Sequence, residues 1–143
     1  MRFLQLAQSN AILNYVTRLG GMIAANPVDQ AISESVMAAI EDFWNSHLQP
    51  TMSMAPEEKK VAREAIAAKQ LPWMFERFER ILKANTTGSG FIAGNTCTAG
   101  DLKAENFWWF LSTGNADHIP ITCMDTFPAI LAHKAKMAVY LAQ

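Results

Sequence analysis

The first eight residues are the only segment in which apolar and polar residues alternate, and every later segment has helical spacing. Phe3, Leu4 and Leu6 are punctuated by Gln5 and Gln8, which predicts a short β-strand. The rest of the sequence predicts no second strand. A lone strand cannot satisfy its own backbone N–H and C=O groups, so it must pair with a segment outside this sequence or with a second copy of the chain. The sequence therefore predicts a helical chain that starts partway through a domain.

Proline, glycine and capping residues predict where the helices begin and end. Ser9 predicts the N-cap of the first helix, and Gly20-Gly21 predicts its end, because glycine tolerates the left-handed conformation found there. Asn26 before Pro27 is typical of a helix start, since a proline there loses only a donor that would be unpaired anyway. The predicted helices cover residues 10–19, 27–47, 56–85, 98–111 and 128–140, with a stop at Pro50 and a bend near Pro72.

Composition argues against several classes of protein. A formal net charge of −1 gives no electrostatic reason to expect nucleic acid or an anionic membrane as a partner. No apolar run approaches the ~18 residues of a membrane span, and the N-terminus becomes polar too quickly for a secretory signal. Cys97 and Cys123 lack a metal-binding spacing, so no metal site is predicted. We expect a soluble, cytoplasmic protein.

Aromatic and histidine residues predict packing more than chemistry. The four tryptophans stand at helical positions beside other apolar residues, so we expect them in the core: Trp44, Trp73, Trp108 and Trp109. The three histidines lie far apart on different segments and suggest no metal or acid–base cluster: His47, His118 and His133.

The turn from the predicted strand to the first helix carries Gln8 and Ser9. A helix start offers unpaired N–H groups and a positive dipole end, which suit a carboxylate, and a serine hydroxyl can donate to the same anion. The alternative is that Ser9 only caps the helix and Gln8 is a solvated strand end. Sequence physics alone favours this alternative.

A second motif, Thr98-Ala99-Gly100-Asp101, fits a helix capping box. In such a box each side chain satisfies a backbone N–H at the other end, and Cys97 with Leu102 would form the accompanying hydrophobic staple. Asp101 could instead be a buried catalytic acid. A structural cap, worth about 1 kcal/mol, is the preferred interpretation.

Residues 6–15 resemble the end of the thioredoxin-like half of glutathione transferases of the sigma, mu and alpha type, where a Gln-Ser pair precedes an Ala-Ile helix. The Thr-x-x-Asp box, residues 73–83 and residues 125–130 resemble later parts of that family in the same order. Gly100 and Cys97 depart from the family, which more often has alanine and a bulkier residue there.

The resemblance implies an all-α bundle of the glutathione transferase C-terminal type, of about five or six helices, preceded by a strand–helix remnant. Residues 1–21 would be the remnant of the thioredoxin-like, glutathione-binding domain, and residues 22–143 the helical domain. Glutathione would be the co-substrate, with no metal, and a hydrophobic small molecule the second substrate of a detoxifying conjugation. Gln8 and Ser9 would contact glutathione, and the protein would form a homodimer.

One further contact follows from the resemblance. A carboxylate on the first long helix of the family reaches glutathione across the dimer, about two turns before another aspartate. Taking Asp42 as the later residue gives Glu34 this role, and a solvated acid on an exposed stripe is at least as well supported by the sequence.

The family's thiol-activating tyrosine, serine or cysteine belongs near the start of the thioredoxin-like half, so no catalytic residue is assigned. The competing function is a non-catalytic interaction module with the same helical fold, and an unrelated helical bundle is a third possibility.

Overall fold

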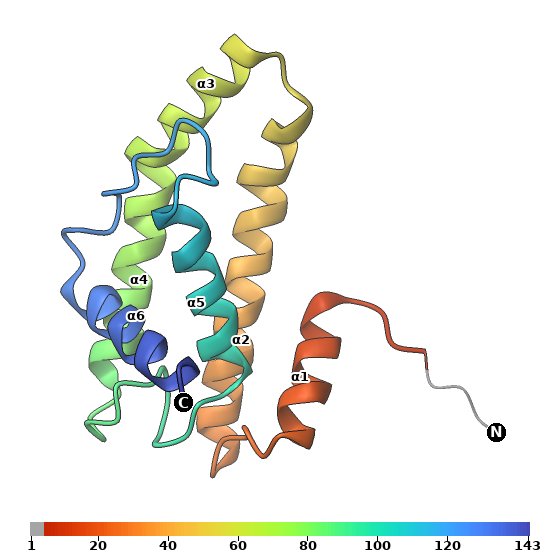
Figure 1. Cartoon of the computed structure of the whole chain (residues 1–143), viewed down its shortest axis with the longest axis vertical. Helices are drawn as coiled ribbons and strands as arrows, with labels where there is room; N and C mark the ends of the chain where they lie inside the picture. The colour runs from red at the N-terminus through yellow and green to blue at the C-terminus, as the bar shows by residue number, and fades with distance from the viewer. Residues whose placement is uncertain (1–4) are drawn as a thin grey trace.

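The chain forms two long helical arms, of which the first (residues 27–53) ascends and the second (residues 56–84) descends in the view of Figure 1. The arms enclose a central helix, and a shorter helix lies beside the lower part of the first arm. The computed structural model describes residues 5–143. Its helices are α1 (Ser9–Leu19), α2 (Pro27–Phe43), α3 (Pro56–Ala65), α4 (Leu71–Ala84), α5 (Ala99–Ser112) and α6 (Pro128–Leu141). The predicted all-α fold is confirmed. No helix among these residues has the length and apolar character needed to cross a membrane.

The start of α1 differs from the sequence prediction. Residues 1–4 of the predicted strand lie outside the described residues, and residues 5–8 form no strand. Gln8, not Ser9, is the N-cap of α1, and its backbone has a φ of 75°. Ser9 is the first helical residue, so its hydroxyl can bond to neighbouring helices. The predicted end of the helix at Gly20 is confirmed.

The first arm extends beyond its predicted stop at Pro50. The Asn26 cap is confirmed, since its side chain accepts hydrogen bonds from the N–H groups of Val28 and Asp29 at 3.0 and 2.9 Å. After Phe43 the chain continues through a π-helical turn (Trp44–Leu48) and a 3₁₀ turn (Gln49–Ser53). Pro50 lies in the first turn of the 3₁₀ segment, where its missing N–H has no helical partner to lose.

The second arm contains the interruption predicted near Pro72. Helices α3 and α4 are joined by a π-helical turn (Ile66–Gln70), and Pro72 lies in the first turn of α4. A proline lacks the N–H of the helical ladder and its ring clashes with the carbonyl four residues earlier. The wider π turn accommodates both defects without ending the arm.

The core surrounds α5, where Ala104, Trp108 and Leu111 are completely buried. The Trp108 ring contacts the edges of Phe75 and Phe78 on α4, with centroids 5.9 and 5.2 Å apart. The core prediction holds for Trp108. It is wrong for two tryptophans that lie on outward faces and are 55% and 52% exposed, Trp73 and Trp109.

A buried carboxylate connects three segments at the start of α5. Asp101, with no exposed surface, accepts hydrogen bonds from the N–H and hydroxyl of Thr98 at 2.9 and 2.8 Å and from the N–H of Ile92 at 2.7 Å. His133 Nε2 of α6 lies 3.0 Å from Oδ1 of Asp101, the oxygen that also accepts from Ile92, and the indole N–H of Trp108 lies 3.3 Å from His133 Nδ1. Trp108 can only donate, so Nδ1 accepts and Nε2–H donates to Asp101.

Gly100 permits close packing of α5 on α2. Its N–H donates to the hydroxyl of Ser33 at 2.9 Å. A Cβ at this position would lie 2.8 Å from that hydroxyl and 2.9 Å from the Ser33 carbonyl oxygen. The departure from alanine at this position therefore has a packing reason.

The start of α6 is capped by a side chain of another helix, Glu79 of α4. The carboxylate of Glu79 on α4 accepts from the N–H groups of Ala129 and Ile130, in the first turn of α6, at 3.0 to 3.2 Å. Burial raises the pKa of Glu79, but these N–H groups and Lys83 outweigh it and leave the pKa lowered. Glu79 thus anchors α6 while it is ionised.

We predict that Gly100→Ala destabilises the protein although alanine is the better helix former. Alanine gains about 1 kcal/mol of helix propensity. The added methyl group would overlap the backbone of Ser33, so we expect a cost in the upper part of the overpacking range, about 2–3 kcal/mol. Urea unfolding followed by circular dichroism measures the difference. Asn106→Ala, on an exposed face of the same helix, is the control and should not destabilise. Equal or higher stability of Gly100→Ala would contradict the packing argument.

We predict that Glu79→Gln lowers the free energy of unfolding by about 1–2 kcal/mol at neutral pH, because a charged cap is replaced by a neutral one. Because the pKa of Glu79 is lower in the folded protein than its ordinary value of 4.5, its ionised form stabilises the folded state above about pH 4.5. This contribution is lost as the pH falls through the folded-state pKa. The difference between the proteins should therefore shrink on acidification. The control is Glu76→Gln, one turn earlier on α4, and a pH-independent difference would refute the ionised cap.

Candidate functional site

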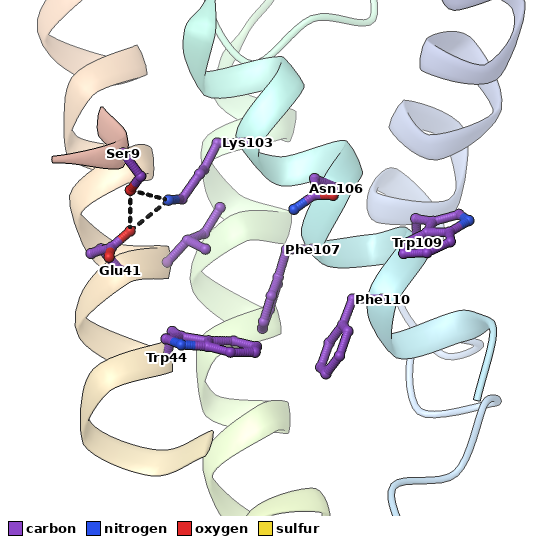
Figure 2. Close-up of a pocket in the computed structure, with 9 residues that line it drawn as sticks. Ser9, Glu41, Trp44, Lys103, Asn106, Phe107, Trp109 and Phe110 are labelled. Atoms are coloured by element: carbon purple, nitrogen blue, oxygen red, sulfur yellow. Dashed lines mark hydrogen bonds and ion pairs between the residues drawn. The ribbon is translucent and has the colours of Figure 1, made fainter. Parts of the chain in front are cut away.

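A cavity of about 360 Å³ lies where the start of α1 meets the second half of α2 and one face of α5. This size is within the range of small-molecule sites. It is lined by Ser9, Ile40, Glu41, Trp44, Lys103, Asn106, Phe107, Trp109 and Phe110. In Figure 2 side chains from the three helices face a common space, except Trp109, which points away on the other side of α5.

One end of the cavity is a closed polar triangle (Figure 2). The ammonium group of Lys103 lies 2.5 Å from Glu41 Oε2 and 3.2 Å from Ser9 Oγ. The Ser9 hydroxyl donates to the same Glu41 oxygen at 3.1 Å. The three residues come from α5, α2 and α1, so the triangle holds α1 against the other two helices.

Glu41 is the anion of this triangle. The hydrogen bond from Lys103 holds its pKa below the usual value, with a further contribution from Ser9, against an opposing effect of burial. Glu41 and Lys103 are 34% and 16% exposed, so solvent screens the pair only partly. The polar end therefore contains two opposite charges that neutralise each other.

The other end of the cavity is aromatic. Trp44 and Phe110 meet edge to face with ring centroids 5.3 Å apart, and the buried Phe107 contacts Phe43 in the same way at 5.9 Å. Rings that pack edge to face give a rigid apolar lining. The cavity as a whole therefore suits a ligand with an aromatic body and a polar group.

Most of this cavity was missed by the sequence analysis. Lys103, Asn106, Phe107 and Phe110 have the i, i+3, i+4, i+7 spacing of one helix face, and Glu41 and Trp44 have the i, i+3 spacing on the first arm. These spacings predict two mixed polar and aromatic faces. They do not show that the two faces lie opposite one another.

The predicted ligand residues occupy different places. Ser9 lines the cavity, and Gln8 lies next to it with an exposed side chain. Glu34 is two turns of α2 away from Glu41, where it lies 3.8 Å from Arg18 of α1 and accepts from Gln30 at 2.9 Å. Within one chain, Gln8 and Ser9 thus lie side by side at the cavity, whereas Glu34 lies away from both of them beside Arg18.

Asp42 does not share the face of Glu34. Eight residues correspond to a rotation of about 80° beyond two full turns. Asp42 lines a separate groove of about 470 Å³ between α2 and α4, together with Trp73 and Arg77. The Arg77 guanidinium lies 3.5 Å from the Trp73 ring centroid.

The two cysteines are not activated. Burial raises the pKa of Cys97 to about 12 and that of Cys123 to about 11, so both are protonated at neutral pH. Among residues 5–143, no three histidine, cysteine or acidic side chains gather where they could hold a metal ion.

Comparison with known proteins identifies the helical body. The family described as "Glutathione S-transferase, C-terminal domain" matches residues 41–139. A probable glutathione S-transferase 6 of Caenorhabditis elegans is 28% identical over 92% of this chain and 62% of that protein. Glutathione S-transferase P of Bos taurus is 27% identical over 94% of this chain and 59% of that protein. The chain thus spans about three fifths of the length of these relatives.

Solved structures share the fold. Prostaglandin synthase D of Nilaparvata lugens superposes with a TM-score of 0.77 at 20% identity, covering 98% of this chain and 69% of that one. A Pi-class glutathione S-transferase of Onchocerca volvulus gives a TM-score of 0.75 at 21% identity, covering 94% and 60%. The match of the family to residues 41–139, with the same helical fold in these structures, shows that the chain belongs to the glutathione S-transferase family.

Proposed function

We propose that this chain is part of a glutathione transferase that conjugates glutathione to hydrophobic electrophiles. The cavity carries the proposal, because it places Ser9 at its polar end and an aromatic wall at the other. In such a protein glutathione would lie at the start of α1 and the electrophile against Trp44, Phe107 and Phe110. The thiol-activating group of the family stands in the thioredoxin-like half, so none of the described residues is given that role.

The proposal includes the division of the chain. Residues 1–21 would be the last part of the thioredoxin-like domain and residues 22–143 the helical domain. The predicted apolar stripe of α1 supports this, because its side chains are 42% to 72% exposed: Ile12, Tyr15, Val16 and Leu19. Such a stripe is expected to pack against another folded unit.

The same stripe gives an observation in favour of the second candidate function, a non-catalytic interaction module. In that case another protein would cover α1 in place of a thioredoxin-like domain. The two functions differ in whether the start of α1 binds glutathione, which the following experiment measures.

We predict that the chain binds glutathione weakly and saturably, and that Ser9→Ala weakens binding about tenfold. The γ-glutamyl carboxylate would lie at the exposed start of α1, outside the cavity, and the Ser9 hydroxyl would turn from Glu41 to donate to it. A hydrogen bond to a charged group contributes about 1.5–3 kcal/mol. Calorimetric titration at millimolar glutathione measures both proteins. The matched control is Ser35→Ala, which removes a serine hydroxyl from α2 at the separate groove between α2 and α4.

Absence of saturable binding by the folded chain would contradict the proposed glutathione site and favour the interaction module. Equal affinity of Ser9→Ala and the unaltered chain would contradict the role of Ser9. Circular dichroism confirms in each case that the helices are intact.

We also predict a homodimer, in which Glu34 would reach the glutathione of the partner chain. Sedimentation velocity at micromolar concentration should then give twice the 15.8 kDa of one chain. One solved relative, Na-GST-3 of Necator americanus, is described as monomeric; it is 26% identical with a TM-score of 0.68. A monomer here would contradict the dimer and the role of Glu34 across it.

A further inference from the structure

The polar end of the cavity does not offer a free positive charge. Glu41 lies 2.5 Å from the Lys103 ammonium, and both side chains are partly buried. A ligand carboxylate brought to Lys103 would also lie close to Glu41, and repulsion between two such anions is weakly screened there. The cavity therefore disfavours an anionic ligand unless Glu41 leaves.

The polar end does offer hydrogen-bond donors. An ammonium group has three N–H donors, and Lys103 uses two of them on Glu41 and Ser9. The amide of Asn106 lies on the same wall, toward the side of Lys103 and Phe107 (Figure 2), and has no hydrogen-bond partner among residues 5–143. A neutral acceptor can use these donors without approaching Glu41 as a second charge.

The apolar end sets the shape of the ligand. Trp44 and Phe110 pack edge to face at an angle of 69°, next to the buried Phe107, and the three rings give this end an apolar lining that suits an aromatic body. A volume of about 360 Å³ accommodates a compound of one or two rings.

We propose that this cavity selects uncharged aromatic compounds with a hydrogen-bond acceptor, such as a carbonyl oxygen, over the corresponding carboxylates. Lys103 and Asn106 are the donors, and Glu41 excludes the anion. The inference rests on the proposed function, in which this cavity receives the electrophile, and it names the class of that co-substrate.

The test compares two probes of similar shape, acetylnaphthalene and naphthoate, by calorimetric titration without glutathione. The unaltered chain should bind the ketone at least about tenfold more tightly than the carboxylate. Glu41→Gln should strengthen naphthoate binding about tenfold, because the charge of Lys103 becomes available, and should change ketone binding less than about threefold. Lys103→Met should weaken ketone binding about threefold or more.

Lys59→Met is the matched control. Lys59 forms a comparable ion pair with Asp117 at 2.6 Å, and neither residue lines the cavity, so both affinities should stay unchanged. The inference is overturned if the unaltered chain binds naphthoate as tightly as the ketone, or if Glu41→Gln leaves their ratio unchanged. It is also overturned if the folded chain binds neither probe.

The outcomes separate this inference from the proposed function. A chain that prefers the ketone but does not bind glutathione keeps the selectivity and loses the transferase role. A chain that binds glutathione but shows no preference between the probes keeps the proposed function and loses only the selectivity.

Discussion

The buried carboxylate of Asp101 is the interaction on which the arrangement of the helices depends. It receives hydrogen bonds from Thr98, Ile92 and His133, and so joins the start of α5, the preceding loop and α6. A carboxylate without exposed surface is tolerated only when its oxygens are well satisfied, so these partners must be in place together. The same bonds explain why Asp101 acts as a structural cap: its oxygens are occupied by groups of the protein itself.

The cavity follows from the position that this anchor gives α5. Gly100 brings α5 against Ser33 of α2, and one turn further along α5, Lys103 meets Glu41. Ser9 completes the triangle from α1, whose remaining apolar face is exposed. The position of Lys103 beside Glu41 thus depends on the close packing of Gly100 on Ser33, one helix turn earlier on α5. The charges of Glu41 and Lys103 cancel within the polar end of the cavity, and this makes the cavity selective for neutral groups.

The fold could be predicted further from the sequence than the site could. Local signals such as Asn26-Pro27 and Thr98-x-x-Asp101 act within one helix turn, and both define helix starts in the structure. The stop predicted at Pro50 was wrong because a 3₁₀ turn accepts a proline in its first turn. Ser9 was predicted as a cap, but tertiary bonds to Glu41 and Lys103 use its hydroxyl. His133 beside Asp101 and Lys103 beside Glu41 are pairs distant in sequence, which no spacing rule could bring together.

The central claim is that the cavity between α1, α2 and α5, and not the groove between α2 and α4, receives the electrophile. The most direct measurement is the indole N–H signals in nitrogen–proton correlation spectra during titration with the dinitrophenyl conjugate of glutathione. Trp44 lines the cavity and Trp73 lines the groove, so each signal reports on one of them. The claim predicts a progressive, saturable shift of the Trp44 signal with Trp73 unchanged. A shift of Trp73 alone, or no shift of Trp44 at saturation, would contradict it.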